Sequence, residues 1–370
     1  MPASVLIAPD KFKDTLTAPQ AAQVIANGWR AARPQDEIVE QPISDGGDGF
    51  GSLLAAALGA EKIAVQTVNA AGQAITACFW KASNEGVLVE SANIIGLAML
   101  TDDQRQPMAI DSTGLGIALQ QLSKSEAKEI IVGIGGSATN DGGFGAARAL
   151  GWIFLDEQSR EIKRWTELSQ LTKIVRPQNA FPIPITVAVD VQNSLLGSQG
   201  CSRIFGPQKG LRESDLPQAE AALARMAEIW TNQSGENTAT IPGTGAAGGL
   251  GFGLHCFAGA TIRPGFDLFT EATGLHKMLS HADWMITGEG SMDQQTTMGK
   301  GVGELALLAR QNNCRTIALA GMIGDRETLQ PHFDQIRALT EITSPSKAKE
   351  NAAQWLEELA HQTAQAITGD

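Results

Sequence analysis

Residues 4–49 read SVLIAPDKFKDTLTAPQAAQVIANGWRAARPQDEIVEQPISDGGDG, and this stretch decides the predicted fold. The apolar run 4–8 predicts a buried strand that ends at the following proline. Thr17, with Gln20 three positions later, predicts the capped start of a helix. A second strand at 37–43 and a helix-like run after the glycines complete a strand–helix–strand–helix order, which is typical of a parallel sheet covered by helices.

Apolar strands recur toward the C-terminus, and one long helix follows them. The predicted strands lie at 283–287, 316–320 and 336–340. The predicted helix covers 347–367. We therefore expect the two ends of the chain to form one Rossmann-like parallel-sheet domain from residues 1–62 and 280–370.

The middle of the chain has a different pattern. Its first strands have the character of an antiparallel arrangement, at 64–68, 74–81 and 86–91. From residue 151 to 280, short strands and glycine turns surround one clear helix at 215–232. We expect a second, inserted mixed α/β domain over 63–279. The whole chain is then an α/β protein with its active-site cleft between the two domains.

The composition is that of an ordinary globular protein, and it excludes several classes of function. The 370 residues are 43% hydrophobic and carry a net charge of −12 with no basic stripe, which argues against a nucleic-acid surface. The four cysteines contain no C-x-x-C pair, which favours a reducing compartment. No apolar run approaches the roughly 18 residues of a membrane-spanning helix. We expect a cytoplasmic protein with neither a membrane nor a nucleic acid as partner.

Glycine-rich loops follow strands or precede helices at four places. Glycine lets backbone N–H groups approach a ligand closely, and a helix that follows favours an anion at its start. Any one such loop is most simply a tight turn, but four of them with polar side chains favour a ligand site. The loops cover 44–49, 133–143, 242–253 and 287–301.

The segment GTGAAG at 243–248 has the spacing of a dinucleotide-binding motif. Such a motif needs a strand directly before it and an acidic residue at the end of the next strand. Here the preceding residues are NTATIP, and no clean strand follows at the right distance. A nicotinamide-dependent oxidoreductase is therefore an alternative that the sequence context disfavours.

Carboxylates and cations stand beside these loops. In open α/β sheets, ligands bind outside the carboxyl ends of the strands, which is where these residues fall. Phosphoryl transfer needs carboxylates to hold magnesium and accept a proton, and cations to bind phosphate. The acidic residues are Asp10, Asp45, Asp48, Asp190, Glu289 and Asp293, and the cations are Lys13, Arg203, Lys209 and Lys300.

Seven motifs, in this order, resemble those of the bacterial type I glycerate kinases over essentially the whole chain. They are APDKFKDTLTA (8–18), PISDGGDG (42–49), GIGGSATNDGG (133–143), AVDVQNSLLG (188–197), GCSRIFGPQKG (200–210), PGTGAAGGLG (242–251) and ITGEGSMDQQTTMGK (286–300). The resemblance implies phosphorylation of D-glycerate by ATP in a two-domain α/β protein, and we expect Mg²⁺ as the metal. Most members of this class resemble 2-kinases, so the implied product is 2-phosphoglycerate.

Three alternatives to this product and activity stay open. A 3-kinase would give 3-phosphoglycerate. A non-catalytic protein that binds a nucleotide or a sugar acid would share the glycine loops, and the oxidoreductase would use GTGAAG. A homodimer is compatible with the sequence.

Residue type and position within these motifs give expected roles. For catalysis we expect Asp190 as the base, Asp45 as the second candidate and Lys13 as an anchor for carboxylate or phosphate. The expected substrate-binding residues are Ser137, Thr139, Asn140, Asp141, Arg203 and Lys209, with Asp141 facing a metal or a hydroxyl. The expected nucleotide-binding residues are Gly288, Gly290, Thr296 and Lys300. The metal is expected at Asp293 and Glu289.

Four positions depart from the usual pattern of the family. Lys11 stands where serine is frequent, and Thr113 stands where arginine is frequent. Asp48 replaces a commoner glutamate, which keeps the carboxylate but shortens its reach by one methylene. Ser194 replaces a proline and affects the rigidity of its loop.

Overall fold

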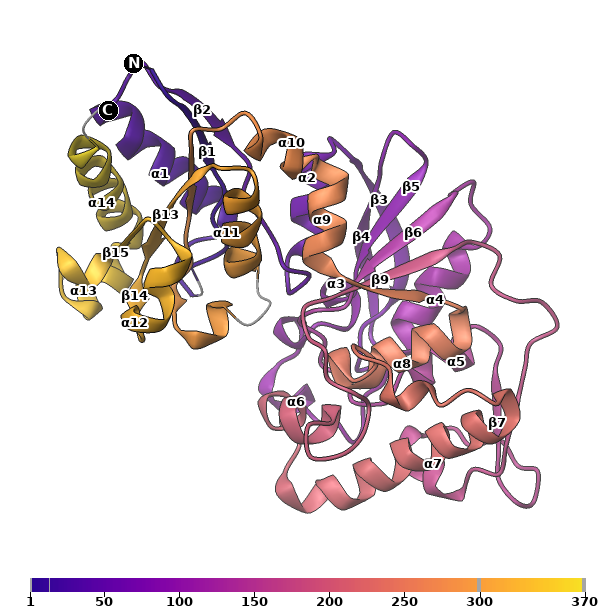
Figure 1. The fold of residues 1–370 in the computed structure, drawn as a ribbon. Coiled ribbons are helices and arrows are strands. Elements are labelled where there is room, and N and C mark those ends of the chain that lie inside the picture. Colours follow the sequence, from indigo (N-terminus) through magenta and orange to yellow (C-terminus); the bar gives the residue numbers. More distant parts are fainter. Residues whose placement is uncertain (1, 13, 298–300, 368–370) are drawn as a thin grey trace. The chain divides into compact units, whose positions relative to one another are not determined.

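The computed structural model describes residues 2–12, 14–297 and 301–367. The chain forms two compact units, one from Met1–Asp45 with Phe269–Asp370 and one from Gly46–Leu268 (Figure 1). These divisions come earlier in the chain than the expected positions near 62 and 280. The first boundary lies before residue 62 because α2 (Phe50–Ala57) packs against strands of the second unit and therefore belongs to that unit.

A five-stranded, fully parallel sheet forms the centre of the first unit. Its spatial order is β15-β13-β11-β1-β2, which is a doubly wound order with the chain switching direction between β1 and β11. The predicted Rossmann-like parallel sheet is therefore confirmed. The strands are β1 (Ser4–Ile7), β2 (Glu37–Glu40), β11 (Trp284–Thr287), β13 (Arg315–Ala320) and β15 (Gln335–Ala338).

Helices cover this sheet, and their apolar faces form its core. Thr17 caps the first of them in a capping box with Gln20, as the sequence predicts. Ile25 and Trp29 of this helix are fully buried in the core cluster of the unit. The main helices of this unit are α1 (Ala18–Ala32), α11 (Gly301–Gln311), α13 (Pro345–Glu350) and α14 (Ala352–Ala366). A further helix, α9 (Gly265–Thr273), begins in the second unit and ends in the first.

The second unit is built on a six-stranded mixed sheet with the order β10-β9-β6-β5-β4-β3. The pairs β3–β4 and β4–β5 are antiparallel, as expected, and the remaining pairs are parallel. The strands are β3 (Glu61–Val68), β4 (Ala74–Lys81), β5 (Gly86–Glu90), β6 (Glu129–Gly133), β9 (Ile185–Val189) and β10 (Thr261–Pro264).

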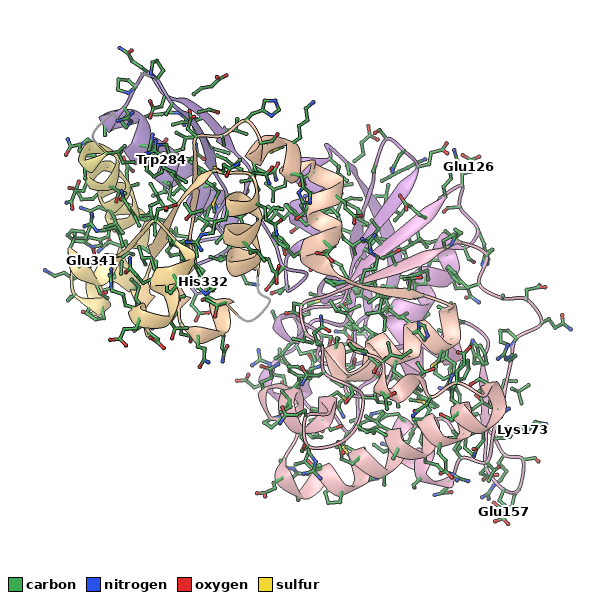
Figure 2. The ribbon with its side chains drawn as sticks, in the orientation of Figure 1. Glu126, Glu157, Lys173, Trp284, His332 and Glu341 are labelled. Atoms are coloured by element: carbon green, nitrogen blue, oxygen red, sulfur yellow. The ribbon has the colours of Figure 1, made fainter. Side chains whose placement is uncertain are left out.

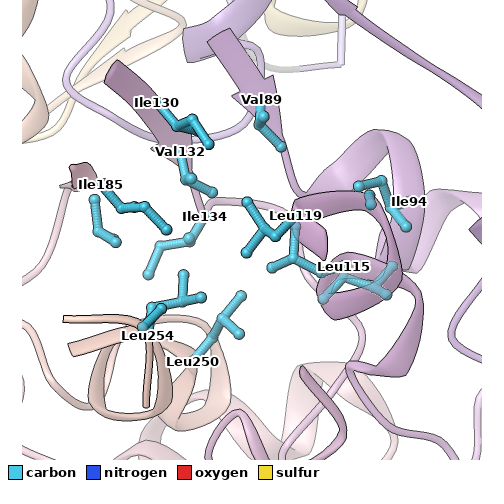
Figure 3. Packing of buried hydrophobic residues seen from close by; sticks show 14 of the residues in the cluster. Val89, Ile94, Leu115, Leu119, Ile130, Val132, Ile134, Ile185, Leu250 and Leu254 are labelled. Atoms are coloured by element: carbon cyan, nitrogen blue, oxygen red, sulfur yellow. The ribbon is translucent and has the colours of Figure 1, made fainter. Parts of the chain in front are cut away.

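The main core of the second unit lies between this sheet and two helices. Figure 3 shows Val132 and Ile185 from the strands facing Leu119 and Leu254 from the helices. A second cluster holds packed aromatic rings, among them Trp152 and Phe257, whose ring centroids are 5.1 Å apart. The helices of eight or more residues that lie wholly in this unit are α2, α4 (Thr113–Leu122), α6 (Cys201–Lys209), α7 (Leu216–Ser234) and α8 (Ala246–Ala258).

Helical structure between 151 and 280 is richer than expected, because only the helix at 215–232 was predicted there. That prediction corresponds to α7, whereas α6, α8, α9 and α10 (Leu275–Leu279) were not predicted. α8 is rich in glycine, which disfavours helices, and almost all of its side chains are buried, so it has no polar face to mark its period. The three left-handed residues Ala247, Gly248 and Gly249 also interrupt it near its start.

Charged side chains lie on the outside of both units. In Figure 2, Glu126, Glu157 and Lys173 extend away from the second unit, and all three are exposed. In the part of the chain that the structure describes, no helix combines the length and apolarity that would let it span a membrane.

Candidate active site

The carboxyl ends of three parallel strands lie along one edge of the second unit's sheet. β5, β6 and β9 end there at Glu90, Gly133 and Val189. Ligands of open α/β sheets bind outside such an edge. We call it the β5–β6–β9 edge, and it comprises residues 46–49, 90–91, 133–143 and 189–190.

The glycine turn before α2 lies directly against two of these strand ends. A Cβ atom on Gly46 would come within 3.0 Å of the carbonyl carbon of Val189. A Cβ atom on Gly135 would come within 2.5 Å of the amide nitrogen of Asp48. Only glycine permits these approaches. The turn therefore carries the exposed Asp48 to the same edge at which the exposed Asp190 follows β9.

Asp141 is fully buried, and protein donors occupy both of its carboxylate oxygens. Oδ2 accepts hydrogen bonds from the amide and hydroxyl of Ser112, at 2.9 and 2.7 Å, and from the amide of Gly145 at 2.9 Å. Oδ1 accepts from the amide of Gly143 at 3.2 Å. Burial, aided by the nearby charge of Asp111, raises the pKa of this carboxyl. These bonds give the Asp141 carboxylate a structural role, because they tie the loop after β6 to Ser112 and to the start of α5 (Phe144–Ala149). Its expected contact with a metal or a substrate hydroxyl stays a prediction.

Lys209, the last residue of α6, reaches into the loop after β6. Its ammonium group donates to the hydroxyl of Ser137 at 2.9 Å and to the carbonyl of Thr139 at 2.7 Å. Only 3% of the residue is exposed, and burial lowers its pKa to about 8, although Cys201 and Asp141 act in the opposite direction. The structure thus brings together three of the predicted substrate-binding residues, because Ser137 and Thr139 both bond to the buried ammonium group of Lys209.

Asn140 continues this polar group toward the start of α6. Its side-chain amide donates to the hydroxyl of Ser202 at 2.9 Å. The Asn140 Oδ1 atom and the Thr139 hydroxyl are buried without a hydrogen-bond partner. Because buried polar atoms are almost always satisfied, two such atoms on adjacent residues indicate a place for a polar ligand or water.

Arg203 is exposed on the surface of α6. Its guanidinium is 3.8 Å from the carboxylate of Glu220, and half of its side chain is accessible to solvent. The structure therefore places Arg203 in a surface ion pair rather than in the buried group around Lys209.

In the first unit, the segments that follow β1 and β11 run side by side beyond the sheet. The amide of Asp10 donates to the carbonyl of Gly288 at 2.9 Å, and the hydroxyl of Thr287 donates to the carbonyl of Ala8 at 2.8 Å. This is the switch point of the doubly wound order, where ligands of such sheets bind. The structure therefore places the start of the predicted nucleotide loop at the expected end of the sheet.

Glu289, Asp293 and Thr296 lie together in this loop. The Thr296 hydroxyl donates to Glu289 Oε1 at 2.8 Å, and its amide donates to the carbonyl of Asp293. Asp293 Oδ1 accepts from the amide of Gln295 at 2.7 Å, which closes a tight turn. The two carboxylates predicted for the metal and one residue predicted for the nucleotide are therefore neighbours.

Glycine is required at position 288, at the start of this loop, for reasons of space. A Cβ atom on Gly288 would come within 1.8 Å of the carbonyl oxygen of Leu319. The carbonyl of Gly290 accepts the amide of Met322 at 3.1 Å, which fixes the loop to the neighbouring strand. Both glycines thus position the backbone next to Glu289.

Asp45, the second candidate for the base, lies beside the start of α11. A Cβ atom on Gly301 would be 3.3 Å from the Asp45 Cβ atom. The predicted anchor Lys13 and the predicted nucleotide residue Lys300 lie outside the described residues. Among the residues that the structure does describe, no three acidic, histidine or cysteine side chains converge to form a metal cage.

Three residues of the β5–β6–β9 edge and its surroundings escaped the sequence analysis. Ser112 and Ser202 bind Asp141 and Asn140 respectively, and no local pattern marks them. Glu90 ends an otherwise apolar strand and is buried. The same signal, an acidic residue at the end of an apolar strand, identified Asp190 and could have identified Glu90.

Comparison with known proteins gives a consistent result over almost the whole chain. Residues 5–368 match the model of the glycerate kinase family. The chain is 37% identical to a glycerate kinase of Halalkalibacterium halodurans over 327 residues, which are 87% of this chain and 86% of that protein. It is 36% identical to the glycerate 2-kinase of Escherichia coli K12 over 328 residues, again 87% and 86% of the two chains.

A solved structure also has the same fold. It is the crystal structure of a Salmonella typhimurium LT2 protein described as glycerate kinase 2, and its sequence is 31% identical to this one. The two superpose with a TM-score of 0.81 over 98% of this chain and 97% of the other.

Proposed function

The chain belongs to the glycerate kinase family, and we propose that it transfers the γ-phosphoryl group of ATP to D-glycerate, giving 2-phosphoglycerate and ADP. The observation that carries this proposal is the family match over residues 5–368. The similarity to a protein named glycerate 2-kinase supports the 2-phosphate as the product. The polar groups at the carboxyl ends of the parallel strands in both sheets supply the chemistry that such a transfer needs.

The buried group around Lys209 is the proposed site for glycerate. The lysine places a positive charge beside the uncommitted Thr139 hydroxyl and Asn140 Oδ1, with the Ser137 hydroxyl also in reach of the cation. A small acid with two hydroxyls matches this set, because its carboxylate pairs with the cation and its hydroxyls bond to oxygen acceptors. Arg203 is a secondary candidate that would approach from the surface of α6.

The loop after β11 is the proposed site for the phosphates of ATP. Gly288 and Gly290 bring backbone close to the ligand, and Thr296 orients Glu289. Glu289 and Asp293 fit Mg²⁺, which proteins usually hold with one or two carboxylates while phosphates and water complete the shell. When bound, the ion neutralises charge on the transferred phosphoryl group. Lys300 and Lys13 remain proposed phosphate or carboxylate anchors from the sequence alone.

Asp190 is the proposed general base, and Asp45 is the second candidate. The 2-hydroxyl oxygen of glycerate bonds to the γ-phosphorus while the bond between that phosphorus and the β,γ-bridging oxygen breaks. ADP leaves with that oxygen, and the hydroxyl proton passes to the Asp190 carboxylate. We also propose a cytoplasmic location, because the four cysteines Cys78, Cys201, Cys256 and Cys314 are free thiols.

The test is ³¹P NMR of the purified protein with D-glycerate, ATP and Mg²⁺, compared with authentic 2- and 3-phosphoglycerate. We expect the 2-phosphoglycerate resonance to grow. Growth of the 3-phosphoglycerate resonance would keep the kinase and overturn the product. Absence of any new phosphoester would overturn the kinase and favour a protein that only binds a nucleotide or sugar acid.

The role of Asp190 is tested in the same assay by Asp190→Asn. Loss of a general base lowers kcat by about 10²–10⁴-fold, and we expect a decrease in this range. Circular dichroism and urea unfolding check that the variant is folded. A folded variant with normal kcat would shift the assignment to Asp45, which Asp45→Asn then tests.

A further inference from the structure

Glu90 is a buried carboxylate at the β5–β6–β9 edge to which no role has been assigned so far. It ends β5, and only 2% of it is exposed. Its Oε1 atom accepts the amide of Gly49 at 2.9 Å, and its Oε2 atom accepts the amide of Ser52 at 3.2 Å. Both oxygens therefore bind the backbone at the start of α2.

These bonds replace a cap that α2 does not have in its own sequence. The N-cap residue is Gly49, which has no side chain and a left-handed backbone (φ 92°). The free amides at the start of a helix need acceptors, and a carboxylate there also interacts favourably with the helix dipole. Gly51 makes room for this acceptor, because a Cβ atom on Gly51 would lie 3.1 Å from Glu90 Oε2.

The turn that Glu90 holds also carries Asp48. A Cβ atom on Gly135 would lie 2.5 Å from the Asp48 amide nitrogen, and one on Gly136 would lie 3.0 Å from Asp48 Oδ1. The turn thus rests on the loop that continues to Ser137 and Thr139. Any movement of the turn displaces Asp48 relative to the proposed glycerate-binding loop.

We propose that Glu90 is a positioning residue for phosphoryl transfer, which holds the Asp48 turn and the loop after β6 in their working arrangement. The inference rests on the proposed function and adds a residue to its machinery. Glu90 itself does not touch the reacting atoms. It acts through the backbone of the turn, and both of its oxygens are needed as acceptors for this.

The protonation of Glu90 couples this arrangement to pH. Burial raises the pKa of its carboxyl to about 7, and the charge of Asp48 adds to this, while the amides of Gly49, Ser52 and Gly51 oppose it. From β4, the uncharged ring of Trp80 packs at the same place. When Glu90 is protonated, one of its oxygens carries a hydrogen and no longer accepts a hydrogen bond from its backbone amide. Below about pH 7 the carboxyl therefore anchors the Asp48 turn through fewer hydrogen bonds.

The pH dependence that Glu90 gives to the free energy of unfolding is opposite to the pH dependence expected for kcat. Its pKa in the folded protein is raised from 4.5 to about 7, so the folded state binds the proton more tightly than the unfolded chain. Its contribution to the free energy of unfolding is therefore greatest below pH 4.5 and is lost as the pH rises through about 7. The kcat for glycerate phosphorylation is expected to rise as the pH increases over the same range.

The decisive comparison is between Glu90→Gln and the matched control Glu85→Gln. Glu85 precedes the same strand, 42% of its side chain is exposed, and its carboxylate pairs with Lys128. Glutamine at position 90 keeps the shape but turns an NH₂ group toward one amide donor. We expect kcat for glycerate phosphorylation to fall by about ten- to a hundredfold in Glu90→Gln, because small displacements of a reacting arrangement are costly. The control is expected to keep the wild-type kcat.

Two further readouts separate positioning from general damage. In Glu90→Gln, amide hydrogen exchange is expected to become faster at residues 46–52 and to stay unchanged elsewhere. The wild-type decrease of kcat below neutral pH is expected to weaken in the variant. If the glutamine variant does not fold, Glu90→Asp keeps the charge but retracts it by one methylene, and the same loss of kcat with retained pH dependence is expected.

Unchanged kcat in folded Glu90→Gln would overturn the proposal, whether or not exchange at 46–52 changes. An equal loss of kcat in Glu85→Gln would also overturn it. If the wild-type protein forms no phosphoester from glycerate, the proposed function fails and the catalytic role of Glu90 fails with it. The exchange measurement then reports separately whether Glu90 holds the turn.

Discussion

At the scale of single residues, the polar side chains of the β5–β6–β9 edge differ in how many of their polar atoms have a hydrogen-bond partner within the protein. Asp141 has protein donors on both carboxylate oxygens. Thr139 and Asn140, two residues and one residue before it, each keep one buried polar atom without a partner. Buried groups are rarely left in that state without a ligand or water. The fold therefore uses both oxygens of Asp141, whereas Thr139 and Asn140 each keep an acceptor for the ligand that we propose there.

This difference predicts the effect of Asp141→Asn. The amide has the same shape as the carboxylate, but it would aim NH₂ hydrogens at backbone donors that now find an acceptor. We expect the free energy of unfolding to fall by about 1–3 kcal/mol, the usual cost of leaving buried groups unsatisfied. Urea unfolding followed by circular dichroism measures the change.

The matched control is Asp102→Asn, because the side chain of Asp102 is 96% exposed. We expect this variant to unfold at the same urea concentration as the wild type. If Asp141→Asn kept full stability but lost its response to Mg²⁺ in the kinase assay, the structural role would be refuted and the original assignment to a metal restored.

At this scale the sequence could predict which residues follow a strand end, but not the direction in which their side chains point. The strand pattern placed both Asp141 and Asp190 after parallel strands, at the edge where ligands bind. Whether a side chain faces outward or into the fold depends on partners distant in sequence. Ser112 lies 29 positions from Asp141, and no local pattern reveals it.

At the scale of elements, the first unit depends on a close contact between α1 and α14. A Cβ atom on Gly28 of α1 would lie 2.2 Å from the carbonyl oxygen of Glu357 in α14. Gly28 is buried within a helix, where glycine is usually unfavourable. Its presence there is explained by the space that the neighbouring backbone needs.

Gly28→Ala is therefore expected to destabilise the protein despite the better helix propensity of alanine. The added methyl group must push α14 away, and overpacking of this kind typically costs about 1–3 kcal/mol. Thermal unfolding by calorimetry measures the loss. Asn27→Ala is the control, because Asn27 is exposed on the same helix and should be neutral or slightly stabilising. A Gly28→Ala protein as stable as this control would contradict the packing argument.

Elements with a clear period were predictable, and elements without one were not. α1 and α7 have an apolar face and a polar face, and both were identified. α4 and α8 carry glycines and are buried on most sides, so neither propensity nor period marks them. Tertiary packing stabilises these helices, and packing cannot be seen in a single sequence.

At the scale of the whole molecule, one unit is continuous in the chain and the other is assembled from two segments. The second unit runs from Gly46 to Leu268 and contains its own sheet and cores. The first unit has β1 and β2 in one segment and β11, β13 and β15 in the other. The interior strand β1 pairs with β2 from its own segment on one side and with β11 from the other segment on the other side.

This organisation predicts different behaviour for fragments. The fragment 46–268 is expected to unfold cooperatively in urea, as judged by circular dichroism. The fragment 269–370 is expected to lack a cooperative transition, because it has no β1 and no α1, and adding a peptide of residues 1–45 should restore one. Cooperative unfolding of 269–370 alone would contradict the role assigned to β1.

The sequence indicated such a discontinuous arrangement because apolar strands of the parallel type occur at both ends and antiparallel ones between them. The positions of the divisions could not be read in the same way. α2 resembles a continuation of the N-terminal strand–helix pattern, yet it packs against β4, β5 and β6. Which sheet a helix covers is decided by three-dimensional packing and not by its place in the pattern.

The position of β1 between β2 and β11 has a consequence for the synthesis of the chain. Ser4 at the start of β1 bonds to Asp283, 279 positions later, so one side of this apolar strand has no partner until the ribosome has passed that point. Closing so long a loop is slow, and an unpaired strand edge invites association with other chains. The continuous second unit can fold during this interval. The nascent N-terminal segment is therefore the part that most needs shielding by a chaperone.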